Sequence, residues 1–330
     1  IGKLYASIIN IKLVNHLEHH NLIDTAQNGF RMVESRNTDD HLISLHEMYN
    51  YAHINKSPLF SAFIDFSKAF DSVPRNAMLA GLKETGISNR LFKAIKSMYK
   101  NTRAQCLANG VKSREFSFHR GVAQGCPLSP TLFATYINSL IKEINETSIG
   151  IDLKDGQPPV GILAYADDIV LLAEDNESLQ KLGTIASKWC EKWGMKANIK
   201  KCGILAIHPD TKPQLKWGDN KFPVVDNYKY LGVTFQSDMQ FSVHTKKIKD
   251  AAYGKLNKIK HILNSKCIGP SLKRRIYEEN IRSKMEYGST TWGFHKNAQK
   301  LEKIQKTSIE EMMNTQGVWL KAAEGELNQS

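Results

Sequence analysis

Cysteine is scarce in this chain of 330 residues, and its five copies follow no pattern. No Cys-x-x-Cys pair occurs, and no histidine stands beside a cysteine at the spacing of metal ligands. The sequence therefore supports neither a disulfide framework nor a zinc finger. The cysteines are Cys106, Cys126, Cys190, Cys202 and Cys267.

Long hydrophobic runs are missing as well. No apolar run reaches the roughly 18 residues that a membrane helix requires, and the first residues lack the pattern of a signal peptide. These absences predict an intracellular protein. Hydrophobic residues still make up 41% of the chain, enough to bury a sizeable core divided over two or three subdomains. The chain begins at Ile1 rather than Met, so we expect a piece of a longer protein.

Acidic residues number 33 against 45 lysines and arginines, which gives a formal net charge of +12. This excess favours a polyanionic partner, nucleic acid before a membrane surface. Much of it lies between His244 and Glu310, where helical patterns carry 16 basic and 6 acidic residues. Basic helices usually mean a solvated face, but such a surplus beside an acidic site is more typical of a surface that tracks phosphates.

Two adjacent carboxylates, Asp167 and Asp168, interrupt the apolar stretch 161–173. The pattern predicts a short hairpin whose turn carries acid and whose arms are buried. Like charges this close repel each other unless a cation lies between them, so the pair indicates a metal or a basic partner. A solvated Asp-Asp turn explains this stretch alone equally well.

A third carboxylate, Asp65, ends the apolar run 59–64, which has the character of a strand. If that strand lies beside the hairpin, Asp65 meets Asp167 at one edge of the sheet. Carboxylate oxygens there would hold hard cations, and a pair of such ions is typical of sites that transfer phosphoryl groups. The three aspartates together therefore predict a two-metal site.

Two loops carry residues suited to a ligand. Residues 119–133 form a loop, punctuated by glycine and proline, that opens a helix reaching about Ile144, and its small residues let a backbone approach a ligand closely. An ordinary helix start with Pro130 in the first turn is the alternative. Arg31 and Arg36 lie near a flexible turn and could grip phosphates, although a solvated basic loop fits them equally well.

The remaining patterns predict secondary structure. Lys200 and Lys201 precede a strand, so a lysine could lie near the carboxylates, although a lysine at a strand edge is also a common guard against aggregation. Helices are expected twice between residues 4 and 48, at 77–82, 90–99 and 176–193, and from 243 onward; strands are expected in a hairpin over 102–118, near 203–207 and over 227–235, where Gly232 breaks the run.

Taken in order, these motifs resemble the reverse transcriptases, most closely those of non-LTR (LINE-type) retrotransposons. Each motif alone is weak, but the order and spacing make the match specific. The resemblance covers about residues 20–240 strongly and the remainder weakly. The motifs are 63–65 with 69–71, then 121–130, 165–168, 198–202 and 230–232.

The resemblance implies an α+β fold, a right-hand polymerase with an antiparallel palm sheet, mixed fingers and a helical thumb. It divides the chain into N-terminal fingers at 1–57, the first acidic strand of the palm at 58–75, an insertion of fingers or palm at 76–118, further palm at 119–240, a basic helical thumb at 241–310 and a frayed tail at 311–330.

The implied activity is that of an RNA-directed DNA polymerase. A primer 3′-hydroxyl would attack the α-phosphorus of a deoxynucleotide on an RNA template, for synthesis of retrotransposon cDNA. By the family pattern, Asp65 and Asp167 would bind two Mg²⁺ ions, with Mn²⁺ as a substitute, while Asp168 assists and the Phe66 backbone carbonyl is a further ligand. Lys201, or its neighbour Lys200, would protonate the leaving pyrophosphate.

The same resemblance gives roles to residues around the nucleotide. Phe70 stands where the family places a steric gate, a ring beneath the deoxyribose that collides with a 2′-hydroxyl. Gln124 would line the pocket, and Gly125 would allow close approach. Leu231 and Gly232 resemble the primer grip.

Arg31 and Arg36 match the fingers arginines near the triphosphate, with a longer spacer than usual that also carries Glu34. The implied partners are an RNA template, a DNA primer and deoxynucleoside triphosphates, with no membrane and with the oligomeric state left open. The implied location is the nucleus, after assembly with RNA in the cytoplasm.

Two other functions stay open at this point. A catalytically silent or domesticated copy that binds RNA would be expected to have lost one of the three aspartates, and all three are present. A two-metal nuclease fits the acids but not Phe70, Gln124 or the run at 230–232.

Overall fold

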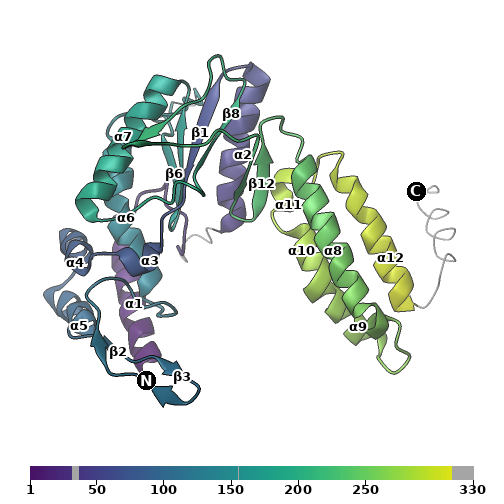
Figure 1. The fold of residues 1–330 in the computed structure, drawn as a ribbon, viewed down its shortest axis with the longest axis horizontal. Coiled ribbons are helices and arrows are strands. Elements are labelled where there is room, and N and C mark those ends of the chain that lie inside the picture. Colours follow the sequence, from purple (N-terminus) through teal and green to yellow (C-terminus); the bar gives the residue numbers. More distant parts are fainter. Residues whose placement is uncertain (32–36, 155, 314–330) are drawn as a thin grey trace. The chain divides into compact units, whose positions relative to one another are not determined.

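The computed structural model describes residues 1–31, 37–154 and 156–313. The chain folds as two compact units, Ile1–Asp226 and Asn227–Ser330 (Figure 1). Within the described ranges, no helix is both long and apolar enough to cross a membrane.

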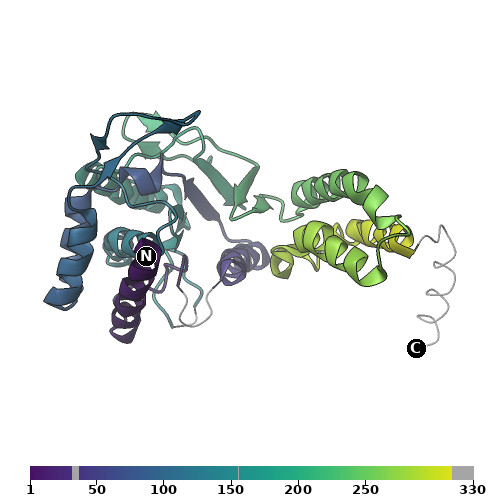
Figure 2. The same cartoon turned by 90° about the horizontal axis from the view of Figure 1, so that it is seen from below.

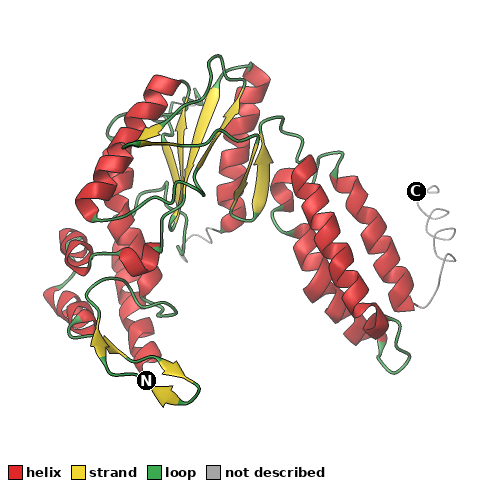
Figure 3. Ribbon diagram, viewed as in Figure 1, coloured by secondary structure: helices red, strands yellow, loops and turns green. Residues whose placement is uncertain are grey.

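The first unit combines helices with short strands (Figure 3). Its elements are α1 (Gly2–His19), α2 (Thr38–Asn55), β1 (Leu59–Ile64), α3 (Ala69–Ser72), α4 (Arg75–Glu84), α5 (Asn89–Tyr99), β2 (Arg103–Ala104), β3 (Leu107–Ala108), β4 (Val111–Lys112), β5 (Phe116–Ser117), α6 (Ser129–Asn145), β6 (Ile162–Tyr165), β7 (Asp168–Ala173), α7 (Asn176–Trp193), β8 (Gly203–Ile207), β9 (Lys216–Trp217) and β10 (Asn220–Lys221).

A four-stranded antiparallel sheet lies at the centre of the first unit, with strand order β6-β7-β1-β8. Helices α6 and α7 pack on one face of this sheet and α2 on the other (Figure 1, Figure 2). All six residues of β1 are buried as a result. A strand covered on both faces buries every side chain, which explains why 59–64 is apolar at every position except Ser61.

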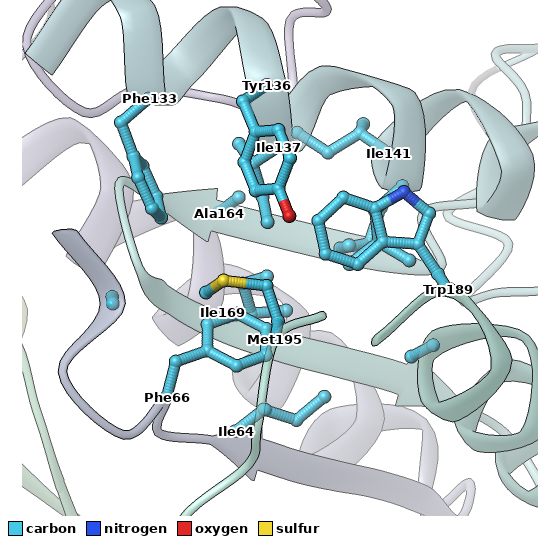
Figure 4. Packing of buried hydrophobic residues seen from close by; sticks show 14 of the residues in the cluster. Ile64, Phe66, Phe133, Tyr136, Ile137, Ile141, Ala164, Ile169, Trp189 and Met195 are labelled. Atoms are coloured by element: carbon cyan, nitrogen blue, oxygen red, sulfur yellow. The ribbon is translucent and has the colours of Figure 1, made fainter. Parts of the chain in front are cut away.

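Large apolar side chains fill the space between the sheet and the helices α6 and α7. Figure 4 shows Ile64 and Ile169, from the strands, near Phe133 and Tyr136 of α6 and Trp189 of α7. The Tyr136 and Trp189 rings are tilted against each other with their centroids 5.3 Å apart. This packing fixes the ends of β1 and β7, where the aspartates stand.

One buried arginine ties several segments of the first unit together. Arg75 donates from Nε to the Gly121 carbonyl at 3.0 Å, and from Nη1 to the carbonyls of Tyr99 at 3.2 Å and Phe118 at 3.0 Å. Its guanidinium also lies 4.8 Å from the centroid of the Phe118 ring. Arg75 therefore joins α4 to α5, to the small hairpins and to the loop before α6.

The second unit is a hairpin followed by helices. Its core includes Leu256 and Leu263 of the first helix with Ile281 and Ile304, whereas Lys258 faces solvent. The elements are β11 (Asn227–Tyr230), β12 (Val233–Gln236), α8 (Ser242–Leu263), α9 (Pro270–Tyr277), the π-helical segment η2 (Glu278–Arg282), α10 (Ser283–Glu286), α11 (Ser289–Trp292), the 3₁₀ segment η3 (Ala298–Leu301) and α12 (Glu302–Met313).

Most predicted elements are confirmed. The helix expected at 176–193 is α7, which begins where the Asp175 side chain accepts the Ser178 N–H and ends at Gly194 in the left-handed conformation. The hairpin expected over 102–118 consists of two short ladders, β2–β5 and β3–β4. The run at 227–235 is the β11–β12 hairpin, and it groups with the helical unit rather than with 119–226.

Candidate active site

The turn between β6 and β7 carries two adjacent carboxylates. Tyr165 pairs with Asp168 in the antiparallel ladder, so Ala166 and Asp167 form a two-residue hairpin turn. Ala166 has φ of 57°, in the left-handed region that residues with a Cβ rarely adopt. A turn with this conformation needs support from the surrounding structure.

The register of the sheet places Asp65 beside this turn. The last pair between β1 and β7 joins Ile64 to Ile169, so the next residue, Asp65, stands opposite Asp168. The Asp65 backbone carbonyl accepts the Asn198 N–H at 2.7 Å, which fixes the chain at this point. The expected meeting of Asp65 with the acidic turn is therefore present in the structure.

Burial and neighbouring carboxylates raise the proton affinity of Asp167 and Asp168. Burial raises the pKa of Asp167, and the charge of Asp65 adds to this shift. Burial is also the largest cause that raises the pKa of Asp168 to about 6, followed by the charges of Asp167 and Asp65. Lys201 opposes both shifts, and its Nζ lies 3.6 Å from Asp65 Oδ1. One positive charge does not balance three negative ones, so the site favours a further cation.

Asp168 gives the metal-free protein a pH dependence that can be measured. Because its pKa rises from 3.8 to about 6 on folding, the Asp168 carboxyl ionises at a lower pH in the unfolded chain than in the folded one. This carboxyl therefore favours the folded state most below pH 3.8, and that contribution is lost as the pH rises through about 6. In EDTA at neutral pH, Asp168→Asn is expected to be more stable than wild type, and the difference should vanish near pH 4. Urea unfolding at several pH values measures this; equal stability at neutral pH would contradict it.

The donor atoms suit a hard divalent cation. Carboxylate oxygens of Asp65, Asp167 and Asp168 and the Phe66 carbonyl are the ligand types that Mg²⁺ and Mn²⁺ prefer. Among the residues that the structure describes, no three His, Cys, Asp or Glu side chains are already gathered as a ready-made metal site. The raised pKa values of Asp167 and Asp168 nevertheless show a cost of ionisation that a bound cation would relieve. The chemistry of the donor set therefore fits a divalent ion.

The loop before α6 packs on α3. Val122 N–H donates to the Phe70 carbonyl at 2.9 Å, and Gln124 Nε2 donates to Asp71 Oδ1 at 3.1 Å. Gly121 has φ of 86°, and a Cβ there would lie 2.9 Å from the Asp71 carbonyl oxygen, so this close approach requires glycine. Phe70 on α3 and Gln124 on the loop, both predicted to face the nucleotide, are thus brought together by two hydrogen bonds between these segments.

The Phe70 ring is half-buried and stacks on Phe133 of α6, with centroids 4.9 Å apart and planes 15° from parallel. This stack holds the ring in one orientation. Gly125, with φ of 76°, has open space where a Cβ would stand. Its surroundings are compatible with the close approach that was predicted for it.

The two candidate lysines differ in their placement. Both side chains are exposed, but Lys201 lies within ion-pair distance of Asp65. Phe66 forms an antiparallel β-bridge with Ala197. Phe66 itself is only 4% exposed. The segment after Asp65 and the segment before Lys201 are therefore held side by side.

Arg31 is engaged elsewhere. Its guanidinium forms a two-pronged ion pair with Glu18 of α1, and Nη1 donates to the Asp24 carbonyl at 3.2 Å. The residue is only 8% exposed. A triphosphate contact would require the pair with Glu18 to break, so this conformation does not show the predicted role. Arg36 lies outside the described residues.

The predicted primer grip is the turn of the β11–β12 hairpin in the second unit. Leu231 and Gly232 have φ of 44° and 89°. The Tyr287 hydroxyl donates to the Leu231 carbonyl at 2.9 Å, and its ring covers Gly232, where a Cβ would lie 2.6 Å from Cε1. Glycine is therefore required at 232 for two reasons: its φ is positive, and a Cβ would clash with the Tyr287 ring. No sequence pattern marked Tyr287, because its partners lie more than fifty residues away.

Comparison with known proteins decides the family. Residues 3–235 match the family described as reverse transcriptase (RNA-dependent DNA polymerase). This span includes Asp65 and the β6–β7 turn. The chain belongs to the reverse transcriptase family. Reverse transcriptases generally use divalent metal ions, which agrees with the donor set of this site.

The curated relatives of this reverse transcriptase chain come from non-LTR retrotransposons, which confirms the predicted resemblance. The Pol polyprotein from type-1 retrotransposable element R2 of Nasonia vitripennis is 30% identical over 237 residues, 68% of this chain and 23% of the relative. The RNA-directed DNA polymerase from mobile element jockey of Drosophila melanogaster is 26% identical over 307 residues, which are 89% of this chain and 32% of the relative. The chain thus spans only about a quarter to a third of their length.

Solved structures with a similar fold include telomerases. Telomerase from Candida Tropicalis in complex with a TWJ fragment of telomeric RNA aligns with 97% of this chain and 56% of its own, at a TM-score of 0.52 and 12% identity. The Candida albicans telomerase gives a TM-score of 0.50 at 13% identity, with the same two coverages. At such identity the likeness concerns the fold alone. It confirms a reverse transcriptase fold with mixed helices and an antiparallel sheet, as predicted.

Proposed function

We propose that this chain is an RNA-directed DNA polymerase, which extends the 3′-hydroxyl of a DNA primer with deoxynucleotides on an RNA template. The observation that carries the proposal is the register of β1 against β7, which brings Asp65 to Asp167 and Asp168 in a member of the reverse transcriptase family. Retention of all three aspartates argues against a silent RNA-binding descendant.

The chemistry is assigned to residues around the β6–β7 turn. Asp65 and Asp167 would hold two divalent ions, Mg²⁺ or Mn²⁺ in its place, with Asp168 and the Phe66 carbonyl as further ligands. Such ions, when bound, lower the pKa of the attacking hydroxyl and neutralise charge on the triphosphate. Lys201 would give the leaving pyrophosphate its proton. We prefer Lys201 to Lys200 because its Nζ lies 3.6 Å from Asp65 Oδ1.

Phe70→Ala is expected to admit ribonucleotides. The stack on Phe133 keeps the Phe70 ring in one orientation, and in the proposed role a 2′-hydroxyl would collide with that ring. Forcing extra atoms into a packed site costs about 1–3 kcal/mol. The preference for deoxynucleotides over ribonucleotides should therefore fall about ten- to hundredfold. Single-nucleotide incorporation, as kcat/KM for each sugar, measures it. Phe92→Ala, at another half-buried phenylalanine, should keep the preference, and unchanged selectivity in Phe70→Ala would remove Phe70 from the role.

The right-hand description of the fold is part of the proposal. Residues 1–57 and 76–118 would form the fingers, 58–75 and 119–240 the palm and 241–310 the thumb. Gln124 and Gly125 would line the nucleotide pocket. Leu231 and Gly232 would position the primer strand, and the hold of Tyr287 on their turn supports a fixed geometry there. Exposed lysines of α8 would track phosphates.

The relatives support the kind of element, and the location is part of the proposal. We propose synthesis of retrotransposon cDNA, in the nucleus, where a DNA primer is present, after assembly with RNA in the cytoplasm. Fractionation of cells that express the element would check the location, and a protein confined to the cytoplasm during cDNA synthesis would contradict it.

Primer extension by the purified chain tests the activity. A DNA primer annealed to an RNA template is incubated with deoxynucleotides in Mg²⁺ and in EDTA, beside the same primer on a DNA template. We expect extension on RNA that depends on the metal. A chain that binds the primed RNA but adds no nucleotide with either Mg²⁺ or Mn²⁺ would favour the RNA-binding alternative instead.

A further inference from the structure

A short segment before Arg31 lies alongside the hairpin that carries the carboxylates. Gln27 forms a parallel bridge with Ala164 of β6. Asn28 N–H donates to the Ala164 carbonyl at 3.0 Å, and Ala164 N–H donates to the Ala26 carbonyl at 2.9 Å. Residues 26–29, which we call the 26–29 segment, therefore pair with β6 along the free edge of the sheet.

The side chain of Gln27 reaches the turn itself. Gln27 is fully buried, and its Oε1 accepts two backbone N–H groups, from Gly29 at 2.8 Å and from Ala166 at 2.9 Å. These two donors fix which end of the amide faces them, since Nε2 could not accept either. Nε2 is buried without a hydrogen-bond partner among the described residues. The Gln27 amide therefore supports the turn through Oε1, while the burial of its Nε2 is not compensated by any described residue.

Ala166 is the residue of the turn that most needs such support. It has φ of 57° with a Cβ present, and it is 4% exposed, so water has little access to its N–H. A two-residue turn of this kind usually has glycine at its first position. The hydrogen bond from Gln27 satisfies the buried donor and holds the unfavourable backbone conformation in place.

The 26–29 segment is itself anchored on two helices. The Arg31 guanidinium pairs with Glu18 of α1, and Asn138 of α6 accepts the Asp24 N–H at 2.8 Å. Asn138 Nδ2 also donates to the Leu22 carbonyl at 2.8 Å. The chain is thus anchored on both sides of the 26–29 segment, at Asp24 and at Arg31, which restricts the position of Gln27 beside the turn.

We propose that Gln27 is a positioning residue for the carboxylate turn. Its Oε1 holds Ala166 in the left-handed conformation and so sets where the next residue, Asp167, presents its carboxylate. The consequence for catalysis rests on the proposed polymerase function. The coupling between Gln27 and Ala166 does not, and it is measurable without activity.

The test compares Gln27→Met, which removes the acceptor, with Gln27→Glu, which keeps it, and with Gln27→Met combined with Ala166→Gly. Glycine adopts positive φ without strain, so the turn should then depend less on Gln27. Gln180→Met is the matched control. Gln180 also bonds backbone groups, the N–H and carbonyl of Lys216, but on α7 away from the turn.

Two readouts are needed, hydrogen exchange of the Ala166 amide and single-nucleotide extension. Gln27→Met should lose protection at Ala166 by about tenfold or more and kcat by about ten- to hundredfold, with KM for the nucleotide nearly unchanged. Adding Ala166→Gly should restore most of kcat. Gln27→Glu should keep the protection, and Gln180→Met should match wild type in both readouts.

Several results would overturn the inference. These are wild-type protection at Ala166 in Gln27→Met, the same loss of protection in Gln27→Glu, or a loss of kcat that Ala166→Gly does not reduce. If Gln27→Met does not fold, hydrogen exchange of the Ala166 amide in Gln27→Glu decides: wild-type protection supports the inference and lost protection overturns it. If wild type extends no primer, the polymerase proposal fails, and exchange at Ala166 still decides the role of Gln27.

Discussion

Replacing Asp167 and Asp168 together with alanine is expected to abolish metal-dependent extension on RNA, by about a thousandfold or more. Metal ions supply several kcal/mol of charge stabilisation in phosphoryl transfer, and each factor of ten corresponds to about 1.4 kcal/mol. Binding of primed template should remain largely intact, since the change removes negative charge only. A primer-extension time course and a separate binding titration measure the two effects.

The fold should survive this change, because burial and mutual repulsion already oppose the ionisation of both carboxyls. Its matched control is Asp210→Ala with Asp219→Ala, which removes the same charge from two exposed positions of the first unit. That variant should extend like wild type. Extension that persists in the Asp167 and Asp168 variant would refute the assignment of the site.

Gly29→Ala is expected to reduce extension by about a hundredfold. A Cβ at Gly29 would overlap the backbone nitrogen of Ala166 and lie 2.9 Å from the backbone carbonyl carbon of Tyr165. Neither neighbour can swing aside as a flexible side chain could, so the turn itself must move. A displacement of about 1 Å at a catalytic group costs on the order of a hundredfold in rate.

The control for Gly29→Ala is Gly81→Ala. Gly81 lies within α4, where a Cβ would meet nothing within 4 Å, so alanine there should leave the rate unchanged and slightly stabilise the helix. Extension rates and thermal unfolding of both variants separate a local effect from loss of fold. Wild-type extension in Gly29→Ala would mean that the turn tolerates the displacement.

Periodicity and strand ends predicted two acidic strand ends, Asp65 and the turn at Asp167, that would form one site if the strands were neighbours. The run 59–64 has the character of a strand that ends at Asp65, and the hairpin is marked by its apolar arms on either side of Asp167 and Asp168. The register then followed from the structure, with Ile64 opposite Ile169. Local patterns predict well where the element is long or the turn is short.

Partners across the chain could not be predicted in the same way. Gln27 bonds to Ala166, 139 residues later, and nothing in its neighbourhood distinguishes it from a solvated glutamine. The ion pair of Arg31 with Glu18 could not be predicted either, because it forms only where the fold brings that carboxylate to the guanidinium. Side-chain partners of this kind depend on the packing of whole elements, which composition and spacing do not encode.

The central claim is that Asp65 and the β6–β7 turn bind the same divalent ions. Titration of the chain with Mn²⁺, followed by the electron paramagnetic resonance signal of the free ion, tests it most directly when wild type is compared with Asp65→Asn. We expect the single change to weaken Mn²⁺ binding by about tenfold or more, since it removes a charged ligand. Unchanged Mn²⁺ affinity in Asp65→Asn would contradict the claim.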